Sequence, residues 1–183
     1  MRGQNSGFSL IEILTVVSLI MIGSTIAVIQ YRASAAIFDA DKASNLVYSQ
    51  LSFAREVSVN ARRNVVVGFI GDNQIKVTRQ NSDSTTTVMS DVTLPAGYTF
   101  GLASGVVVNT LDGFGCGSAV HFNSGTSGTF VGNGTFVDAS NVLLNGCVFT
   151  IGSGNGSARG VTLSGSTGRI KRYWLQSTTW VAR

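Results

Sequence analysis

Gly7-Phe8-Ser9-Leu10-Ile11-Glu12-Ile13-Leu14 opens a run, from Phe8 to Ile29, in which Glu12 is the only charged residue. A helix needs about 20 mostly apolar residues to cross the ~30 Å hydrocarbon core of a bilayer, and this run is long enough. A carboxylate inside such a span costs roughly 2.5–3.5 kcal/mol, so we expect Glu12 to have a partner. The run therefore predicts an N-terminal membrane-spanning helix with one functional charge.

Two partners for Glu12 remain open. In a capping box, Ser9 caps the helix and Glu12, three residues later, reaches back to the Ser9 amide. Alternatively, cleavage after Gly7 makes Phe8 a cationic N-terminus, and the Phe8 amine of one subunit meets Glu12 of its neighbour in a filament. Both hold if Glu12 changes partner during assembly.

The order of polar leader, Gly7, Phe8, Glu12 and apolar run resembles the type IV prepilin cleavage and methylation motif. In that class a prepilin peptidase cuts after the glycine, methylates the new Phe amine and leaves the helix as membrane anchor and filament core. The resemblance implies a single span in the inner membrane, a periplasmic head, and assembly with other pilin or pseudopilin subunits into a pilus or pseudopilus. An ordinary secretory signal is instead cut after its apolar stretch.

The rest of the chain predicts a helix followed by strands. Residues 31–63 contain no Pro or Gly, and Ala43, Val47, Leu51 and Ala54 recur at helical spacing. We predict an α+β fold in which a long N-terminal α-helix, transmembrane in its first half, packs on a C-terminal antiparallel β-sheet head. The predicted divisions are a leader peptide (1–7), a transmembrane and filament-core helix (8–30), an amphipathic continuation (31–63) and a β-rich periplasmic head (64–183).

The head is expected to form one meandering antiparallel sheet or two small sheets, with Gly- and Asn-containing turns. Charges on the second half of the helix, including Asp39 and Asp41, are interpreted as solvated because they lack the spaced oxygens of a calcium loop. The expected strands are 65–70, 74–79, 88–94, 98–102, 106–108, 119–122, 128–131, 135–137, 147–151, 161–163 and 168–175.

Four short pieces extend the resemblance to most of the chain. They are Leu51-Ser52-Phe53-Ala54-Arg55-Glu56, Val65-Val66-Val67, Val120-His121-Phe122 followed by Gly125, and Gly168-Arg169-Ile170. In this order they are similar to the GspH/FimT family of minor pilins and pseudopilins. The resemblance implies a structural subunit of a type IV pilus or of a type II secretion pseudopilus, which works in protein secretion or pilus assembly.

The residue types needed for catalysis or a metal site do not occur in a suitable pattern. His121 is the only histidine and has no candidate nucleophile in a recognisable arrangement, so we predict no enzyme and no cofactor. Cys116 and Cys147 are too few and too far apart for a zinc site. In a head outside the cytoplasm they are candidates for a disulfide, and two buried free thiols are the alternative.

The C-terminal part is basic, since no acidic residue follows Asp138. Strand alternation from Gly168 would place Arg169, Lys171 and Tyr173 on one face, where the cations bind phosphate and the ring stacks on a base. The segment is also similar to the Gly-Arg-x-Arg motif with which some FimT-type pilins bind DNA, although Lys171, followed by Arg172, replaces the second Arg. The alternatives are a DNA-binding subunit of the natural-transformation uptake machinery, with Arg169, Lys171, Arg172 and Tyr173 as contacts, and an ordinary final strand of the sheet.

Overall fold

The computed structural model describes residues 9–108, 111–122, 125–152 and 154–182; the side chains of residues 29–30, 32–36 and 154–156 are not described. The predicted leader, residues 1–7, therefore lies outside the described residues. The chain divides into two units, residues 1–36 and 37–183, and every described strand lies in the second.

One helix, α1 (Leu10–Ala61), accounts for 52 residues. It ends where Arg62 adopts the left-handed conformation, with φ of 50°. The amides of Arg62 and Arg63 donate to the carbonyls of Val59 and Ser58 at 3.4 and 3.2 Å, which closes the last turn. The sequence prediction of an unbroken helix to about this point is confirmed.

The first sheet, sheet A, begins with the hairpin that the sequence predicts. Val65 pairs with Arg79 and Ile70 with Gln74, around a turn at Gly71 whose φ is 58°. Alternate residues of the first strand are buried, as expected for a strand with one face on a core. The strand order is β3-β2-β1-β6-β7, formed by β1 (Val65–Ile70), β2 (Gln74–Gln80), β3 (Thr86–Thr93), β6 (Ser127–Phe130) and β7 (Phe136–Val137).

The second sheet, sheet B, has six strands, and its described strand pairs are all antiparallel. Its order is β11-β10-β9-β8-β4, and β5 also pairs with β8. The strands are β4 (Thr99–Phe100), β5 (Val120–Phe122), β8 (Gly146–Gly152), β9 (Gly154–Leu163), β10 (Ile170–Gln176) and β11 (Thr179–Ala182). The head is thus built on two small sheets, the second of the two predicted arrangements.

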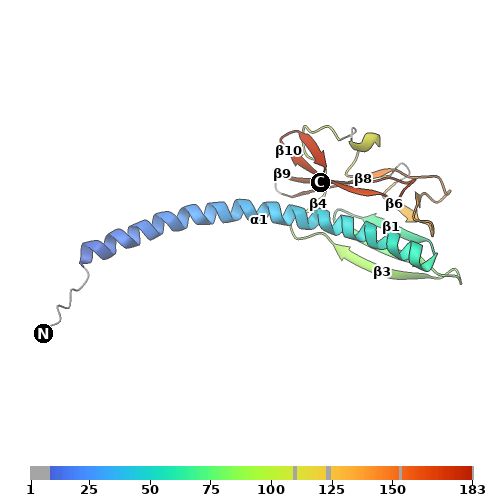
Figure 1. The fold of residues 1–183 in the computed structure, drawn as a ribbon, viewed down its shortest axis with the longest axis horizontal. Coiled ribbons are helices and arrows are strands. Elements are labelled where there is room, and N and C mark those ends of the chain that lie inside the picture. The colour runs from blue at the N-terminus through green and yellow to red at the C-terminus, as the bar shows by residue number, and fades with distance from the viewer. Residues whose placement is uncertain (1–8, 109–110, 123–124, 153, 183) are drawn as a thin grey trace. The chain divides into compact units, whose positions relative to one another are not determined.

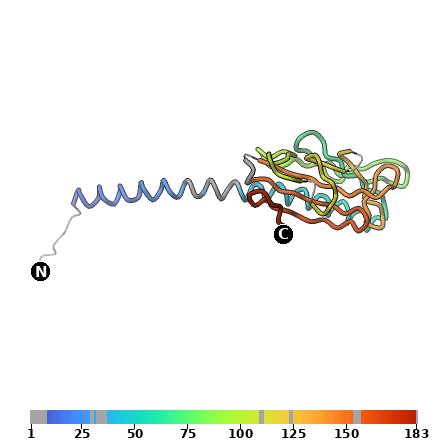
Figure 2. Tube along the Cα trace, turned by 90° about the horizontal axis from the view of Figure 1, so that it is seen from above, coloured from blue at the N-terminus to red at the C-terminus, as the bar shows by residue number. Residues whose placement is uncertain are grey.

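The second half of α1 joins the two sheets through one core. Ala43, Val47 and Leu51 are buried in a cluster that also holds Val67 of sheet A and Val161 of sheet B. Within the head, Figure 1 shows β3 on one side of the helix and β9 and β10 on the other, and Figure 2 shows residues 37–61 lying among the strands. Burial of this helical face against both sheets stabilises the head.

The other face of sheet B is covered by a loop, residues 101–118, which we call the covering loop. Its Leu111 and Cys116 are buried with Phe149 and Tyr173 of the sheet, and it contains the short 3-10 helix η1 (Leu111–Gly113). The strand expected at 106–108 is wrong, because the structure describes no strand there. Val106 and Val108 pack on sheet B while Val107 is exposed, and the buried Val108 explains the misleading apolar pattern.

Two further differences from the predicted strands concern β11 and the beginning of β9. The last strand, β11, was missed, and β9 begins at Gly154 instead of at 161. The described side chains of β9 from Ser157 to Leu163 are buried on both faces, so the strand lacks the apolar and polar alternation that identifies a half-exposed strand.

Candidate functional site

The apolar part of α1, Leu10–Val28, is long and apolar enough to cross a membrane, with a mean hydropathy of 2.2. None of this segment is buried within the described structure. Leu10 and Leu19, for example, are 81% and 69% exposed. A stretch of this size that is not covered by the described residues needs lipid or another protein to cover it.

The hydroxyl groups of this segment are satisfied within the helix. Those of Ser18, Ser24 and Thr25 donate to the carbonyls four residues earlier at 2.7–2.9 Å, and Thr15 Oγ1 donates to the Glu12 carbonyl at 2.8 Å. Such bonds remove the cost of burying a hydroxyl in an apolar medium. Glu12 is the remaining polar side chain whose charge has no described partner.

Glu12 lies in the first turn of α1 and is exposed. The amides of Glu12 and Ile13 both donate to the Ser9 carbonyl, at 3.0 and 3.2 Å. A carboxylate at a helix N-terminus is favoured by the helix dipole. Gly7 and Phe8, the predicted cleavage and methylation residues, lie outside the described residues, so the pairing of Glu12 with a Phe8 amine stays a prediction.

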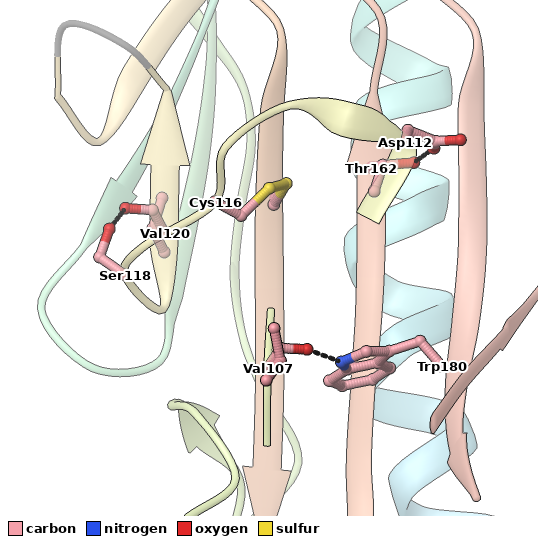
Figure 3. The surroundings of a disulfide bond; sticks show 8 residues. Val107, Asp112, Cys116, Ser118, Val120, Thr162 and Trp180 are labelled. Atoms are coloured by element: carbon pink, nitrogen blue, oxygen red, sulfur yellow. Dashed lines mark hydrogen bonds between the residues drawn. A yellow bond between two sulfur atoms is a disulfide. The ribbon is translucent and has the colours of Figure 1, made fainter. Parts of the chain in front are cut away.

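Arg169, Lys171 and Tyr173, which were predicted to share one face, do not form one exposed surface. Lys171 forms an ion pair with Asp112 of the covering loop, and Thr162 Oγ1 donates to the same carboxylate at 2.5 Å (Figure 3). Tyr173 is only 9% exposed, in the cluster under the covering loop. The prediction that the Tyr173 ring stacks on a base is therefore wrong, because sheet B and the covering loop enclose it.

The pKa values around Asp112 follow from this contact. Burial by itself raises the pKa of Asp112, but hydrogen bonds from Lys171, Thr162 and Tyr173 outweigh it and hold that pKa below its ordinary value. The hydrogen bond to Asp112 raises the pKa of Lys171, and burial raises the pKa of Tyr173. Asp112 and Lys171 thus both keep their charged forms over a wide pH range, and the pair ties the covering loop to β10.

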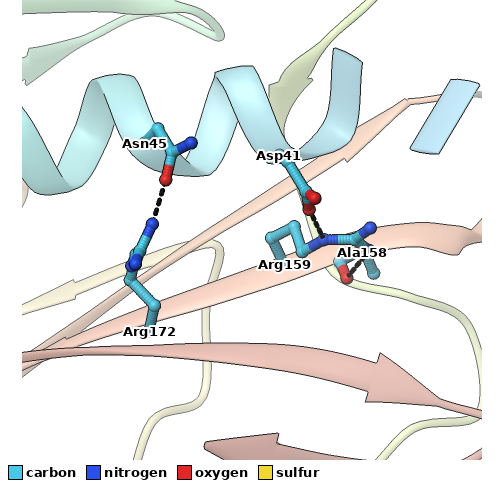
Figure 4. Close-up of polar contacts among 5 residues, drawn as sticks. All are labelled: Asp41, Asn45, Ala158, Arg159 and Arg172. Atoms are coloured by element: carbon cyan, nitrogen blue, oxygen red, sulfur yellow. Dashed lines mark hydrogen bonds and ion pairs between the residues drawn. The ribbon is translucent and has the colours of Figure 1, made fainter. Parts of the chain in front are cut away.

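Arg172 points toward α1, on the opposite face of sheet B. Its guanidinium donates to Asn45 Oδ1 (Figure 4) and lies 5.0 Å from the ring centroid of Tyr48. The strand alternation predicted from the sequence is correct for these neighbours, since Lys171 and Arg172 face opposite ways. Arg169 alone of the four has an exposed side chain with no described hydrogen bond or ion pair.

The interpretation of Asp41 as a solvated side chain is wrong. Its Oδ1 accepts a hydrogen bond from Arg159 Nε at 2.8 Å (Figure 4), and the two side chains are 23% and 4% exposed. Arg159 also donates to the Ala158 carbonyl at 2.9 Å and lies 5.3 Å from the Trp174 ring centroid. This buried ion pair connects α1 to the middle of sheet B.

Cys116 and Cys147 form a disulfide in the structure, with a Cα–Cα distance of 6.0 Å (Figure 3). Both residues are fully buried. The bond ties the covering loop to β8, next to the Asp112 contact. Trp180 Nε1 adds a third tie, because it donates to the Val107 carbonyl at 3.2 Å.

Two residues make contacts that the sequence did not predict: Arg55, one of the helix charges expected to face water, and Asp112. Each lies far along the chain from its partners: Asp112 is 59 residues from Lys171, and Arg55 is 112 residues from Thr167. No local motif marks such pairs. The sequence shows only that Asp112 is an acidic residue in a mostly apolar stretch, which is a weak indication of an ion pair.

The N-terminal segment agrees with a known sequence family. Residues 2–28 match the family model of the prokaryotic N-terminal methylation motif. The fold matches the crystal structure of the type IV minor pilin FimU from Pseudomonas aeruginosa, with a TM-score of 0.50 at 17% identity, covering 77% of this chain and 91% of FimU. The chain therefore has a type IV pilin-like fold.

Two further structures resemble the pilin-like protein. A second crystal form of Pseudomonas aeruginosa FimU gives a TM-score of 0.49 at 16% identity, over 77% of this chain and 96% of that one. The minor pseudopilin EpsH of the type 2 secretion system of Vibrio cholerae gives 0.38 at 9% identity, over 79% and 96%. No curated protein sequence matches the pilin-like protein significantly. The predicted combination of a methylation motif with a pilin-like α+β fold is confirmed.

Proposed function

We propose that the pilin-like protein is a minor structural subunit of a type IV pilus or a type II secretion pseudopilus. The observation that carries this proposal is the exposed apolar segment Leu10–Val28, which lies within the residues that match the methylation motif and contains one carboxylate. The segment is covered by lipid before assembly and by the corresponding helices of neighbouring subunits afterwards. A compact β head that has its own core remains outside this helical bundle.

Processing and location follow from the same motif. A prepilin peptidase cuts after Gly7 and methylates the amine of Phe8. Before assembly, the protein crosses the inner membrane once, with its head in the periplasm; the positively charged leader residue Arg2 stays on the cytoplasmic side. As a minor subunit it lies at or near the tip, where the head meets other minor subunits or cargo.

Glu12 provides axial register during assembly. In an apolar environment an unpaired carboxylate is costly, and the Phe8 amine of a neighbouring subunit neutralises it. Only one axial offset between two helices brings these groups together, so the ion pair selects that offset. The hydroxyl groups of the segment do not compete for Glu12, because they donate to backbone carbonyls.

The test is to replace Glu12 with alanine and to compare membrane insertion with incorporation into sheared filaments. The variant is expected to insert normally and to be absent from filaments, whereas Asp72→Ala, which removes an exposed carboxylate from the head, is the control for loss of charge. Mass spectrometry of the mature N-terminus checks for cleavage after Gly7 and one added methyl group. Normal incorporation of the Glu12 variant would remove Glu12 from the mechanism.

The alternative of a DNA-binding uptake subunit has no specific observation in its favour. Of its predicted contacts, Lys171 and Arg172 are engaged within the head and Tyr173 is buried. Arg169 alone remains available. One free arginine does not make the continuous cationic track that single-stranded nucleic acid requires.

A further inference from the structure

A hollow of about 500 Å³ lies between the second half of α1 and the turn that joins β9 to β10. This volume is within the range of ordinary ligand sites. We call it the arginine groove. Its helix side includes Ser52, Arg55, Glu56 and Asn60, and its other side includes Gly168 and Arg169.

Arg55 is fixed at one side of the groove. Its Nε donates to the Gly134 carbonyl at 3.4 Å, and its second terminal nitrogen donates to the Thr167 carbonyl at 3.2 Å. Gly168 makes this placement possible, because a Cβ at that position would lie 2.5 Å from Arg55 Nε and would overlap the Gly134 carbonyl. The guanidinium is therefore oriented before any ligand arrives, which reduces the entropic cost of binding.

Arg169 follows Gly168 directly and lines the same groove. Its side chain is exposed, and none of the three ion pairs in the described part of the chain includes Arg55 or Arg169. Two like charges that share a hollow repel each other unless an anion lies between them. A bound carboxylate would accept charge-assisted hydrogen bonds from both side chains.

Glu56 restricts the kind of anion that fits. It lines the groove beside the two arginines and is likewise absent from the described ion pairs. A polyphosphate or nucleic acid would bring further negative charge against Glu56. A peptide instead presents one carboxylate to the arginines and backbone N–H groups to Glu56, while Ser52 and Asn60 offer neutral hydrogen-bonding groups.

We infer that the arginine groove docks an acidic peptide segment of a partner protein, whose carboxylate is bound by Arg55 and Arg169. The inference goes beyond the proposed function, since it assigns a recognition site to the side of the head. It does not depend on filament assembly, because the site is complete within one chain.

The experiment is a ¹H–¹⁵N NMR titration of the full chain in detergent micelles. The probes are a blocked Ser-Gly-Glu-Gly-Ser peptide, its Gln counterpart, tripolyphosphate and a short DNA duplex, all at constant ionic strength. The Glu peptide is expected to shift the amide signals of Gly168 and Arg169 and to bind about tenfold more tightly than the Gln peptide, the size of one charge-assisted hydrogen bond.

Matched variants separate the groove from general surface charge. Arg169→Gln is expected to weaken the Glu peptide about tenfold, whereas Arg63→Gln removes the same charge from an exposed position outside the groove and leaves binding unchanged. Glu56→Gln is expected to strengthen tripolyphosphate binding. Three results would each overturn the inference. The first is equal affinity for the Glu and Gln peptides, and the second is unchanged affinity of Arg169→Gln for the Glu peptide. The third is tighter binding of DNA or tripolyphosphate than of the Glu peptide to the unmodified chain.

Discussion

Replacing Asp41 with alanine is expected to destabilise the head by about 3 kcal/mol, because it leaves the Arg159 guanidinium buried without its carboxylate. Breaking a buried ion pair by removing one partner costs roughly 3–5 kcal/mol. The lower end applies here because Asp41 is 23% exposed and because Arg159, at 4%, keeps its hydrogen bond to the Ala158 carbonyl.

Replacing Arg159, the other partner, is expected to destabilise the head less. Arg159→Met removes the buried charge and keeps much of the apolar volume, so the expected cost is smaller, about 1–2 kcal/mol. The Asp41→Ala, Arg159→Met double variant is expected to be less destabilised than the sum of the two single variants. Such non-additivity is the signature of direct coupling between the two side chains.

The chain contains its own control two residues earlier on the same helix. Asp39 and Lys42 form an ion pair of 2.7 Å, almost the same length as the 2.8 Å contact between Asp41 and Arg159, but their side chains are 46% and 68% exposed. An exposed pair of this kind contributes at most about 0.5 kcal/mol. Asp39→Ala is therefore expected to be close to neutral, and burial accounts for the difference.

The assay is urea unfolding of the full chain in micelles, followed by tryptophan fluorescence and analysed by linear extrapolation. Both tryptophans of the chain, Trp174 and Trp180, lie in sheet B, so the signal reports on the head and not on the apolar segment. Equal losses in Asp39→Ala and Asp41→Ala, or strictly additive losses in the double variant, would refute the assignment of a stabilising buried pair.

Three other substitutions follow from the structure. Gly168→Ala is expected to cost about 2–4 kcal/mol in urea unfolding, because its φ is 62° and the new Cβ overlaps a carbonyl; Gly68→Ala, with open space around it, is the near-neutral control. Asp112→Asn should make the free energy of unfolding less dependent on pH at acidic pH. The folded-state pKa of Asp112 is below the ordinary 3.8, so the carboxylate stabilises the fold above pH 3.8. This contribution is lost as the pH falls through the folded-state pKa. Replacing Cys116 and Cys147 with serine should lower the unfolding free energy by about 3.7 kcal/mol, from the chain-entropy relation for a separation of 31 residues, and an unchanged urea midpoint would count against a stabilising bond.

The sequence predicted most of the local structure because local periodicity carries it. The hairpin of β1 and β2 was predicted to within a residue, since Ile75 and Val77 of β2 alternate with polar residues and a Gly-Asp-Asn turn separates the strands. The covering loop and β9 were not predicted correctly, because Val108 is buried without strand pairing and the described part of β9 is buried on both faces. In both cases tertiary packing determines burial in a way that the local pattern does not reveal.

By itself, the sequence determined the apolar helix, the position of Glu12 within it and the order of helix and strands. These properties depend on composition and on spacings of a few residues. Only the tertiary structure decided which charges remain available: Asp41 pairs with a residue 118 positions away and Lys171 with one 59 positions away, while Arg169 stays exposed. A salt bridge between distant segments depends on how the two sheets and the covering loop pack, and no short-range pattern encodes that packing.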